Sequence, residues 1–454
     1  MSKSKLGFYG GVGSVTGANF HLDTGDSRIL VDCGLVQGDR FEEKENHNPF
    51  SYDPAVVDFL LVTHAHADHI GRIPKLVREG FKGTIYSTEP TLALAGVMLR
   101  DAFKVMSFES EKYGTPLLYK EEDIAAALGL WKPVEYEATL ALKDGVSAVF
   151  TDVGHILGSA SITLERAGRR ITFSGDIGND PQPLLNPPVI PKDYDYLVIE
   201  SVYGDRQHEE VEERSELLQG YLEKTIKQKG TLIIPAFSLE RTQGMLFEIN
   251  NMVESGKIEP IPVFLDSPLA IEVTDIYRER TKYLRDSVRE QIKKGDNIFD
   301  FPKLKLTRSV SDSEAINRTK GAKVIIAGSG MSHGGRILKH EQNFLSNPNT
   351  ILLLVGYQSV GSIGRRLKDG APSLKIDGKK VVVKAEVASI QGWSGHADRD
   401  QLVSFVAKGG DKAKQVFVAM GEERSSLFLV QRLRDYLGVN AVAPGPEEVV
   451  EIEF

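Results

Sequence analysis

Thr63-His64-Ala65-His66-Ala67-Asp68-His69 is the most informative segment of this chain. Three of the ten histidines of the chain fall within its last six positions, together with one carboxylate. The apolar run Phe59–Val62 precedes it and predicts a short buried strand. Because His64 and His66 are two residues apart, their rings project to the same side of an extended segment. The stretch therefore predicts two imidazoles presented together at the end of a strand.

Asp68 and His69 lie where the chain is predicted to change from strand to helix. Apolar residues at 70, 73, 76 and 77 have the spacing of one helix face. One chain reversal can then present His64 and His66 to one metal ion, and Asp68 and His69 to a neighbouring ion. Neutral imidazoles combined with oxygen ligands favour zinc, with manganese or iron as alternatives. The other interpretation is a polar turn that is merely rich in histidine, and the demanding ligand spacing argues against it.

The length and composition indicate a soluble protein of several domains. A chain of 454 residues exceeds one ordinary core, so two or three domains are expected. The hydrophobic content of 41% and charged content of 26% are typical of globular proteins, and no apolar run reaches the length of a membrane span. The single cysteine, Cys33, excludes an intramolecular disulfide framework and is compatible with a reducing cytoplasm, the predicted location. The net charge of −8 argues against a protein that coats nucleic acid, although a local basic groove and metal ions can still bind phosphates.

The pattern of predicted elements changes near residue 209. Before it, short strands alternate with turns and a few helices; the strands are expected at 28–31, 59–62, 148–152, 171–173 and 196–199, and the helices at 90–110 and 121–130. After it, longer helices alternate with strands, which favours an α/β domain with a parallel sheet and crossover helices. These helices are expected at 209–229, 241–254, 268–294, 335–346, after 398 and at 422–437, and the strands at 231–235, 262–265, 323–327, 350–355, 381–388 and 415–418.

Two further loops carry residues that suit the same metal centre. The segment from Asp152 to His155 places a histidine just after a strand, and Phe173-Ser-Gly-Asp176 puts an aspartate at a strand end. A carboxylate has two oxygens and can bridge two metals, which a single imidazole cannot. The two expected sites consist of His64, His66, His155 and Asp176, and of Asp68, His69 and Asp176.

Asp32, in Val31-Asp32-Cys33-Gly34, lies upstream of the histidine stretch. It is suited to accept a hydrogen bond from a metal-binding imidazole and so to fix its orientation. An aspartate that merely stabilises a turn before Gly34 is the other interpretation.

The ordered motifs resemble those of the metallo-β-lactamase superfamily. The motifs are THAHADH at 63–69, GHILGSA at 154–160 and SGDIG at 174–178, with VDCG at 31–34. Further segments narrow the resemblance to the β-CASP nucleases: IESVYGD at 199–205, PAFSLERTQ at 235–243, LDSPLA at 265–270, GSGMSHGGR at 328–336 and SGHAD at 394–398. The similarity runs nearly end to end. The subgroup it resembles comprises prokaryotic ribonucleases related to the endonuclease subunit of the cleavage and polyadenylation specificity factor.

The resemblance implies an αββα sandwich that is interrupted by an inserted domain. Residues 1–203 and 390–454 would form the metallo-β-lactamase domain, and residues 204–389 the β-CASP cassette with its parallel sheet. The cassette would roof the metal cleft, and a single strand of nucleic acid would enter between the two domains. Because related proteins commonly form homodimers, a homodimer is also expected.

The resemblance also assigns roles to residues outside the histidine stretch. His396 would be the general acid that protonates the leaving oxygen, and Glu200 would hold its imidazole in the right tautomer. Without the resemblance, His396 is equally a histidine at a helix start and Glu200 an acid at a strand end. Asp68 is expected to be both a metal ligand and a catalytic residue. Arg241 and Arg336 of the cassette are expected to bind the phosphate backbone, and simple solvation is the other interpretation of both.

One position departs from the family pattern. Relatives that cut RNA carry a histidine before Gly-Glu that ligates the second metal, whereas this chain has Met420 before Gly421 and Glu422. A thioether is a poor zinc ligand beside oxygen and nitrogen donors. We therefore expect two zinc sites, of which the second is weaker and partly empty. Compensation by Glu422, or by His333 of the cassette, is not supported by their spacing.

The expected function is a zinc-dependent ribonuclease that hydrolyses RNA phosphodiester bonds with a metal-activated hydroxide. Endonuclease action is expected, and 5′–3′ exonuclease action is a further option. Because DNA-cutting β-CASP enzymes have an apolar residue at the position of Met420, a single-strand DNA nuclease is the first alternative. A catalytically weak scaffold that binds nucleic acid is the second. A small-molecule hydrolase is disfavoured, because the cassette would cover a pocket that needs only a small substrate.

Overall fold

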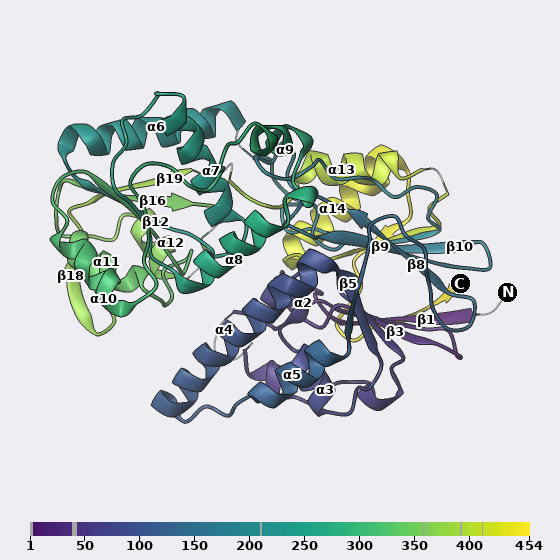
Figure 1. The fold of residues 1–454 in the computed structure, drawn as a ribbon. Helices are drawn as coiled ribbons and strands as arrows, with labels where there is room; N and C mark the ends of the chain where they lie inside the picture. Colours follow the sequence, from purple (N-terminus) through teal and green to yellow (C-terminus); the bar gives the residue numbers. More distant parts are fainter. Residues whose placement is uncertain are drawn as a thin grey trace. The chain divides into compact units, whose positions relative to one another are not determined.

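The computed structural model describes residues 3–38, 43–208, 211–356, 358–359, 361–390, 393–410 and 412–454 (Figure 1). The chain divides into two compact units. Unit 1 comprises Met1–Gln182, Asn186–Gln207 and His396–Phe454, and unit 2 comprises Pro183–Leu185 and His208–Gly395. Unit 2 is therefore built almost entirely from one long insertion into the chain of unit 1.

The boundaries of the units differ by a few residues from the expected domain limits at 203 and 389. The chain leaves unit 1 after Gln207 and returns to it at His396. Residues as far as 390 belong to unit 2 because strand β19 (Glu386–Ile390) pairs with β16 (Thr350–Val355) of its sheet.

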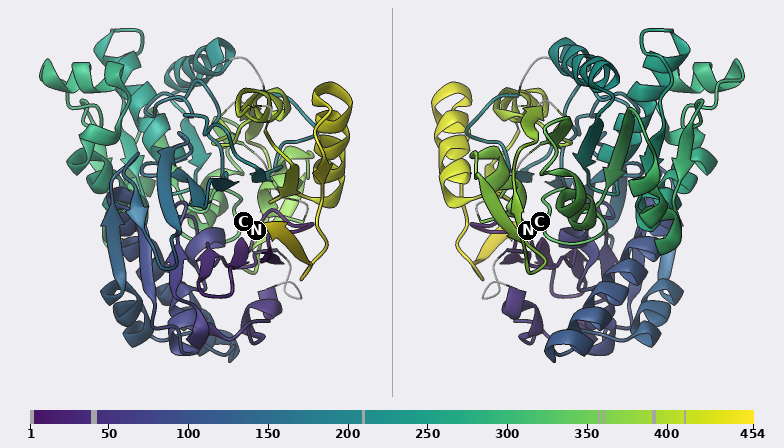
Figure 2. Two further views of the ribbon diagram at one scale, coloured as in Figure 1. Left: turned by 90° about the vertical axis from the view of Figure 1, so that its right-hand side faces the viewer. Right: turned by 90° about the vertical axis from the view of Figure 1, so that its left-hand side faces the viewer.

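The first sheet of unit 1 has seven strands in the order β22-β1-β2-β3-β4-β5-β6. Their bounds are β1 Lys3–Gly10, β2 Asn19–Asp23, β3 Arg28–Val31, β4 Phe59–Leu61, β5 Thr84–Thr88, β6 Trp131–Val134 and β22 Val449–Glu453. Strands β3 to β6 run parallel, and β1 pairs antiparallel with both β2 and β22. Through the β1–β22 pair the two ends of the chain lie side by side (Figure 2).

The second sheet of unit 1 also has seven strands, in the order β21-β20-β11-β10-β9-β8-β7. Their bounds are β7 Leu140–Ala141, β8 Ser147–Asp152, β9 Ala160–Arg166, β10 Arg169–Phe173, β11 Tyr196–Glu200, β20 Gln415–Ala419 and β21 Ala441–Val442. Strand β11 precedes the insertion and β20 follows it, yet the two pair in parallel along their whole length. The sheet is therefore complete only when the chain has returned from unit 2.

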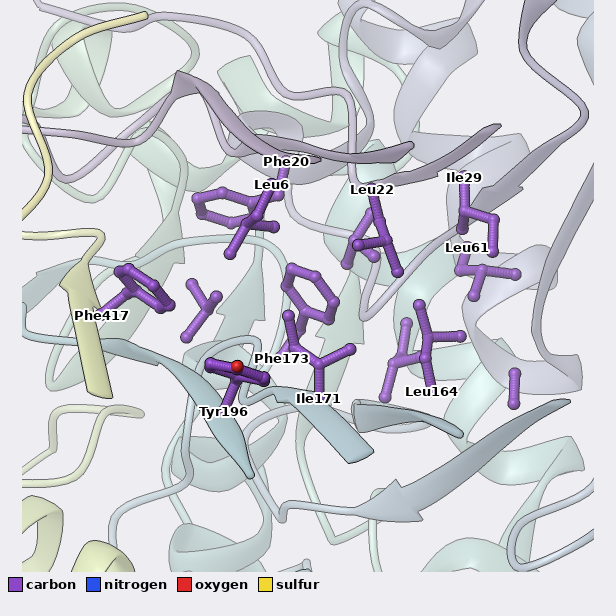
Figure 3. Packing of buried hydrophobic residues seen from close by; sticks show 14 of the residues in the cluster. Leu6, Phe20, Leu22, Ile29, Leu61, Leu164, Ile171, Phe173, Tyr196 and Phe417 are labelled. Carbon is purple, nitrogen blue, oxygen red and sulfur yellow. The ribbon is translucent and has the colours of Figure 1, made fainter. Parts of the chain in front are cut away.

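Unit 1 has four layers. The two sheets face each other across one apolar core, to which Leu6 and Leu22 contribute from the first sheet and Leu164, Phe173 and Phe417 from the second (Figure 3). Four helices lie on the side of the first sheet: α2 (Ala67–Ile70), α3 (Ile73–Arg78), α4 (Glu89–Tyr113) and α5 (Glu121–Gly129). Two helices pack on the second sheet through a separate core: α13 (Arg399–Lys408) and α14 (Glu423–Leu437). Short 3₁₀ helices lie at Glu45–His47 and Pro54–Val56. The expected αββα sandwich is confirmed.

Unit 2 contains a six-stranded, all-parallel sheet in the order β14-β13-β15-β12-β16-β19. The remaining strand bounds are β12 Thr231–Pro235, β13 Val263–Leu265, β14 Leu304–Leu306 and β15 Lys323–Ala327. The helices are α6 Val211–Gln228, α7 Arg241–Glu254, α8 Pro268–Glu279, α9 Asp286–Lys293, α10 Val310–Ala315, α11 Ile337–Phe344 and α12 Ile363–Lys368, with 3₁₀ turns at Thr281–Tyr283 and Ile316–Arg318. Central strands such as Thr350–Val355 are apolar and buried throughout, as parallel strands covered on both faces require. The parallel sheet expected for the cassette is confirmed.

Two predicted elements of unit 2 are wrong. The helix expected at 268–294 is interrupted after Glu279 and resumes at Asp286, because Tyr283 and Leu284 turn into the core and the backbone N–H of Arg285 donates to the carbonyl of Leu184. The strand expected at 381–388 is two strands. The first, β18 (Lys379–Val382), forms a hairpin with β17 (Ser373–Ile376), and the second is β19. In the part of the chain that is described, no helix is both long and apolar enough to cross a membrane.

Candidate metal centre

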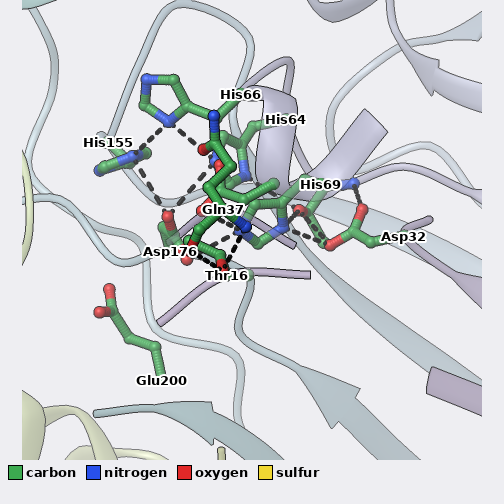
Figure 4. A network of polar contacts seen from close by, with 12 residues as sticks. Thr16, Asp32, Gln37, His64, His66, His69, His155, Asp176 and Glu200 are labelled. Carbon is green, nitrogen blue, oxygen red and sulfur yellow. Dashed lines mark hydrogen bonds and ion pairs between the residues drawn. The ribbon is translucent and has the colours of Figure 1, made fainter. Parts of the chain in front are cut away.

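Three loops of unit 1 bring His64, His66, His155 and Asp176 together (Figure 4). The first two residues follow β4 of the first sheet, whereas His155 follows β8 and Asp176 follows β10 of the second. One ligand atom from each of the four side chains lies within 4.8 Å of the others. The Oδ2 atom of Asp176 is 3.4 Å from Nε2 of His64 and 3.5 Å from Nε2 of His155. These are the residues that the sequence predicts for the first site.

A second group shares Asp176 with the first and adds Asp68 and His69. Helix α2 begins directly after His66, which places both added residues in its first turn. Nε2 of His69 is 3.3 Å from Oδ1 of Asp176 and 3.9 Å from Oδ2 of Asp68. The two oxygens of Asp176 therefore face different groups, as expected of a bridging carboxylate.

Asp32 fixes the orientation of His69. Its Oδ2 atom lies 2.7 Å from Nδ1 of His69, so Nε2 of the ring is directed toward Asp176. The same carboxylate accepts hydrogen bonds from the backbone N–H and the hydroxyl of Thr63, at 2.8 and 2.7 Å. Asp32 thus orients the imidazole and also stabilises the turn, which combines the two interpretations of its sequence. Thr63, whose hydroxyl lies 3.0 Å from Nδ1 of His64, was not singled out from the sequence, and its only signal is its place before His64.

Two buried polar atoms in the second group test whether the residues fit a metal ion. Nε2 of His69 and Oδ1 of Asp176 have no hydrogen-bond partner among the described residues, although they lie only 3.3 Å apart. Leaving such atoms unpaired in the interior is costly. A divalent cation between them would satisfy both, and imidazole nitrogens with carboxylate oxygens form a donor set that zinc, manganese and iron accept. The residues therefore fit a divalent metal.

The electrostatics of the first group favour a cation. Burial lowers the pKa of His64 well below its ordinary value, so its ring is neutral and offers a lone pair. Burial by itself would raise the pKa of Asp176, but His69 and His64 overcome it and hold this pKa well below its usual range. Asp176 is therefore a buried anion surrounded by imidazoles.

His396 and Glu200 form a pair beside the first group. Nδ1 of His396 is 3.2 Å from Oε2 of Glu200 and 3.8 Å from Oδ2 of Asp176. The backbone N–H of Ile177 donates to Oε1 of Glu200. The carbonyl of Ile177 accepts from the backbone N–H of Ala397 at 2.7 Å. Burial, reinforced by Asp176, raises the pKa of Glu200 well above its usual range. An acid–base pair thus lies next to the candidate metal ligands.

Met420 lies beside the second group but packs into the core. Its backbone N–H donates to the carbonyl of Gly11 at 2.6 Å, and its side chain is 3% exposed. Together with Asp32, His69 and Glu200 it lines a small cavity under the metal centre. A Cβ atom placed on Gly11 would lie 2.3 Å from the sulfur, which shows how closely the thioether packs there. Of the two substitutes that were considered, Glu422 is exposed and His333 belongs to unit 2.

Arg241 and Arg336 are engaged within unit 2. The guanidinium of Arg241 donates to the carbonyl of Val355 at 2.8 Å and lies over the ring of Phe237. The guanidinium of Arg336 is 2.7 Å from Asp266 and also donates to the carbonyls of Thr307 and Arg308. These contacts give both residues a role in holding loops of unit 2, and their contact with phosphates stays a prediction.

Three family models match the chain in sequence order. The metallo-β-lactamase superfamily model matches residues 18–226, the Beta-Casp domain model 242–367, and the model of the Zn-dependent metallo-hydrolase RNA specificity domain 380–444. A solved structure of a protein of unknown function from Enterococcus faecalis V583 has a TM-score of 0.57 at 11% identity, covering 99% of this chain and 100% of its own. That likeness concerns the fold alone.

Several curated proteins are similar to nearly the whole chain. Ribonuclease TTHA0252 of Thermus thermophilus is 38% identical over 421 residues, which are 93% of this chain and 94% of that protein. The RNase J-like protein of Methanocaldococcus jannaschii is 30% identical over 97% of both chains. The transcription termination factor FttA of Methanosarcina mazei is 31% identical over 98% of this chain and 71% of its own length. The chain is thus a metal-dependent hydrolase of the nuclease class and belongs to the β-CASP family of the metallo-β-lactamase superfamily.

Proposed function

We propose that this chain is a zinc-dependent ribonuclease that cuts single-stranded RNA as an endonuclease, with 5′–3′ exonuclease action as a second mode. The observation that carries the proposal is the convergence of His64, His66, His155 and Asp176 within 4.8 Å, next to the pair of His396 and Glu200. RNA is favoured as the substrate because a relative 38% identical over 93% of the chain is a ribonuclease.

The residues of unit 1 divide the reaction between them. Divalent ions, when bound, lower the pKa of a water molecule and neutralise charge on the phosphodiester. Asp176 and the imidazoles around it would hold those ions. His396 donates a proton to the 3′ oxygen as it leaves phosphorus, so that the products are a 3′-hydroxyl and a 5′-phosphate. Glu200 accepts a hydrogen bond from Nδ1 of His396, which orients the ring so that Nε2 carries the transferred proton, and Nε2 is reprotonated from solvent after each cycle.

Cleavage assays on matched RNA and DNA test the substrate and the need for metal. Purified protein is incubated with labelled single strands of one sequence, with and without a chelator, and its metal content is determined by elemental analysis. We expect chelator-sensitive cutting of RNA and bound zinc. Cutting of DNA alone would overturn the choice of substrate.

Two variants test the proton donor. His396→Ala is expected to lower kcat by about 10²- to 10⁴-fold, the contribution typical of a general acid, while the metal content stays the same. Glu200→Gln keeps a side-chain oxygen that can accept from Nδ1 of His396 but removes the carboxyl group. Its kcat should therefore fall less than that of His396→Ala. Full activity of His396→Ala would exclude the proposed role.

A scaffold that binds RNA without cutting it is the second candidate. It is favoured by Met420, whose thioether packs against Gly11 instead of supplying a metal ligand. This function predicts RNA binding with no cleavage, and no difference between the parent chain and His396→Ala.

We propose the cytoplasm as the compartment. The support is the single cysteine, Cys33, which is fully buried, and whose pKa burial raises to about 11. A thiol of this kind needs neither an oxidising environment nor a disulfide partner.

A further inference from the structure

A two-stranded hairpin in unit 2 is firmly anchored on one side. Strands β17 and β18 are joined by Asp377-Gly378, whose φ angles of +44° and +81° are those of a tight two-residue turn. Leu374 and Val381 face each other across the pair and are buried in the apolar core on one side of the unit. The side-chain amide of Gln342 in α11 also donates to the carbonyl of Ile376 at 2.9 Å. The hairpin, labelled β18 beside α11 in Figure 1, is therefore a fixed part of the unit.

The other side of this hairpin presents lysines. Lys375 and Lys380 are directly opposite each other in the antiparallel pair, and both are exposed. Lys379 adjoins them at the turn, and Lys384 follows the second strand. No ion pair is formed by any of these four lysines within the described residues. Like charges placed directly opposite each other destabilise a strand pair, so the arrangement is not explained by stability.

The sequence around the hairpin concentrates positive charge in an otherwise acidic chain. Residues 365–384 carry seven lysines and arginines against two aspartates, whereas the whole chain has a net charge of −8. One of the two aspartates, Asp369, pairs with Arg365 in α12 at 2.9 Å and so does not neutralise the hairpin. Leu367 of the same helix packs in the core that holds Leu374, which keeps α12 next to the hairpin. A local positive surface of this kind attracts polyanions although the protein as a whole repels them.

We propose that the lysine hairpin, defined as Lys375, Lys379, Lys380 and Lys384, binds the phosphate backbone of the single-stranded RNA that the enzyme cuts. The proposal rests on the ribonuclease function and adds a substrate-binding surface that contains no metal ligand. Lysines act as point charges toward phosphate, and the exposed residues of the hairpin include no aromatic ring on which a base could stack. Binding is therefore expected to be independent of sequence and strongly dependent on salt.

Protection of strand edges is the competing explanation, because lysine on an edge strand prevents association with other sheets. That role does not need two lysines opposite each other. A lysine opposite a glutamate would protect the edge equally well and would add a favourable cross-strand pair.

Salt-dependent binding measures the contribution of the hairpin. The full chain with His396→Ala, which slows cleavage, is titrated into a fluorescent single-stranded RNA between about 50 and about 200 mM salt. K375E/K380E is compared with K82E/K132E, which makes the same change of charge at two exposed lysines of unit 1. We expect K375E/K380E to weaken binding at low salt by about tenfold or more and to reduce the salt slope by ~1.4, since each phosphate contact contributes ~0.7 on a single strand. The control variant should keep the slope of the parent.

The outcomes separate this inference from the proposed function. If K375E/K380E binds RNA like the control, the hairpin is not a binding surface, whether or not the enzyme cuts RNA. If the parent chain shows no chelator-sensitive cleavage but K375E/K380E still loses binding, the ribonuclease function fails and the surface stands. Binding to anionic phospholipid vesicles is measured for the same variants. If K375E/K380E lost vesicle binding but bound RNA like the parent, the lysines would be assigned to lipid and the inference would be overturned. If K375E/K380E folds poorly, K375Q/K380Q is used instead, because it removes the charges without reversing them. The salt dependence of its RNA binding is then compared with that of the parent.

Discussion

Met420 occupies a backbone conformation that suits a different residue. Its φ is +44°, a region in which histidine is found several times more often than methionine. Its side chain also lines the cavity that reaches His69. We predict that Met420→His raises the zinc content toward two ions per chain, because an imidazole binds zinc far better than a thioether. The measurement is elemental analysis after dialysis against a fixed concentration of free zinc.

Met420→Leu is the matched control, since leucine fills a similar volume without offering a ligand. Its metal content should equal that of the parent. A parent chain that already holds two zinc ions would show that methionine does not weaken the second site.

Glu341 in unit 2 is expected to make stability depend on pH. It is fully buried in α11, its Oε2 atom has no partner in the described part of the chain, and burial raises its pKa from 4.5 to about 7. The folded protein therefore holds this proton more tightly than the unfolded chain does. The contribution of Glu341 to stability is complete below pH 4.5 and is lost as the pH rises through about 7, because the unfolded chain releases the proton at a lower pH than the folded protein does.

We predict that Glu341→Gln removes this loss of stability. The difference in free energy of unfolding between about pH 5 and about pH 8 should shrink by up to ~3 kcal/mol relative to the parent, since one pKa unit corresponds to about 1.4 kcal/mol. Urea denaturation at the two pH values provides the measurement. Glu254→Gln, a change at an exposed site in α7, should leave the difference as it is. Parallel pH curves for the parent and Glu341→Gln would contradict the prediction.

Helices and strands could be predicted from the sequence where a local pattern of residues is sufficient to specify them. Apolar runs such as 350–355 and 323–327 became strands at the expected positions. The break within 268–294 could not be seen, because residues 280–285 contain neither glycine nor proline and the segment is held by the contact between Arg285 and Leu184. The hairpin at 373–382 could have been found, because Asp377-Gly378 between apolar residues is a strong signal for a tight turn.

The lysine hairpin leads to a prediction in which stability and binding move in opposite directions. Lys380→Glu turns the facing pair of lysines into an opposite-charge pair, so the free energy of unfolding should rise by about 0.2–1 kcal/mol. The same change should weaken RNA binding. Chemical denaturation measures the first effect and fluorescence anisotropy the second. Lys384→Glu is the control: because Lys384 faces no lysine within the hairpin, this change should not raise the free energy of unfolding. If Lys380→Glu were less stable than the parent, Lys375 and Lys380 would not repel each other.

At the scale of the whole molecule, the metal ligands could be named from sequence because their motifs are local. His64, His66 and His69 fall within one turn of the chain, and His155 and Asp176 each follow a strand in a short recognisable motif. The contact of Asp32 with His69 could only be suggested, since it joins loops that become neighbours when β3 and β4 pair. The packing of Met420 against Gly11 was beyond reach, because it depends on how the two sheets face each other.

Metal ions are expected to tie the two sheets of unit 1 together. The ligands His64 and His66 extend from the first sheet, whereas His155 and Asp176 extend from the second. Removal of the ions by a chelator should therefore lower the melting temperature of unit 1, and the free energy of unfolding should fall by about 4 kcal/mol for an ion present at a thousand times its Kd. Differential scanning calorimetry should show one transition that shifts and one, from unit 2, that does not.

A chain with His155→Ala is the control for this effect, since the loss of one of the four ligands of the first site should make its melting temperature respond less to the chelator. If both transitions of the parent shifted equally, or neither did, the ions would not bridge the sheets of unit 1.

The long insertion between β11 and β20 also sets the order in which a growing polypeptide acquires its parts. All six candidate metal ligands precede residue 180, but His396 is synthesised only after the whole of unit 2. A nascent chain that has reached residue 180 thus carries every candidate metal ligand while it still lacks the proposed proton donor. The proposed catalytic centre is therefore complete only after His396 and strand β20 have been synthesised.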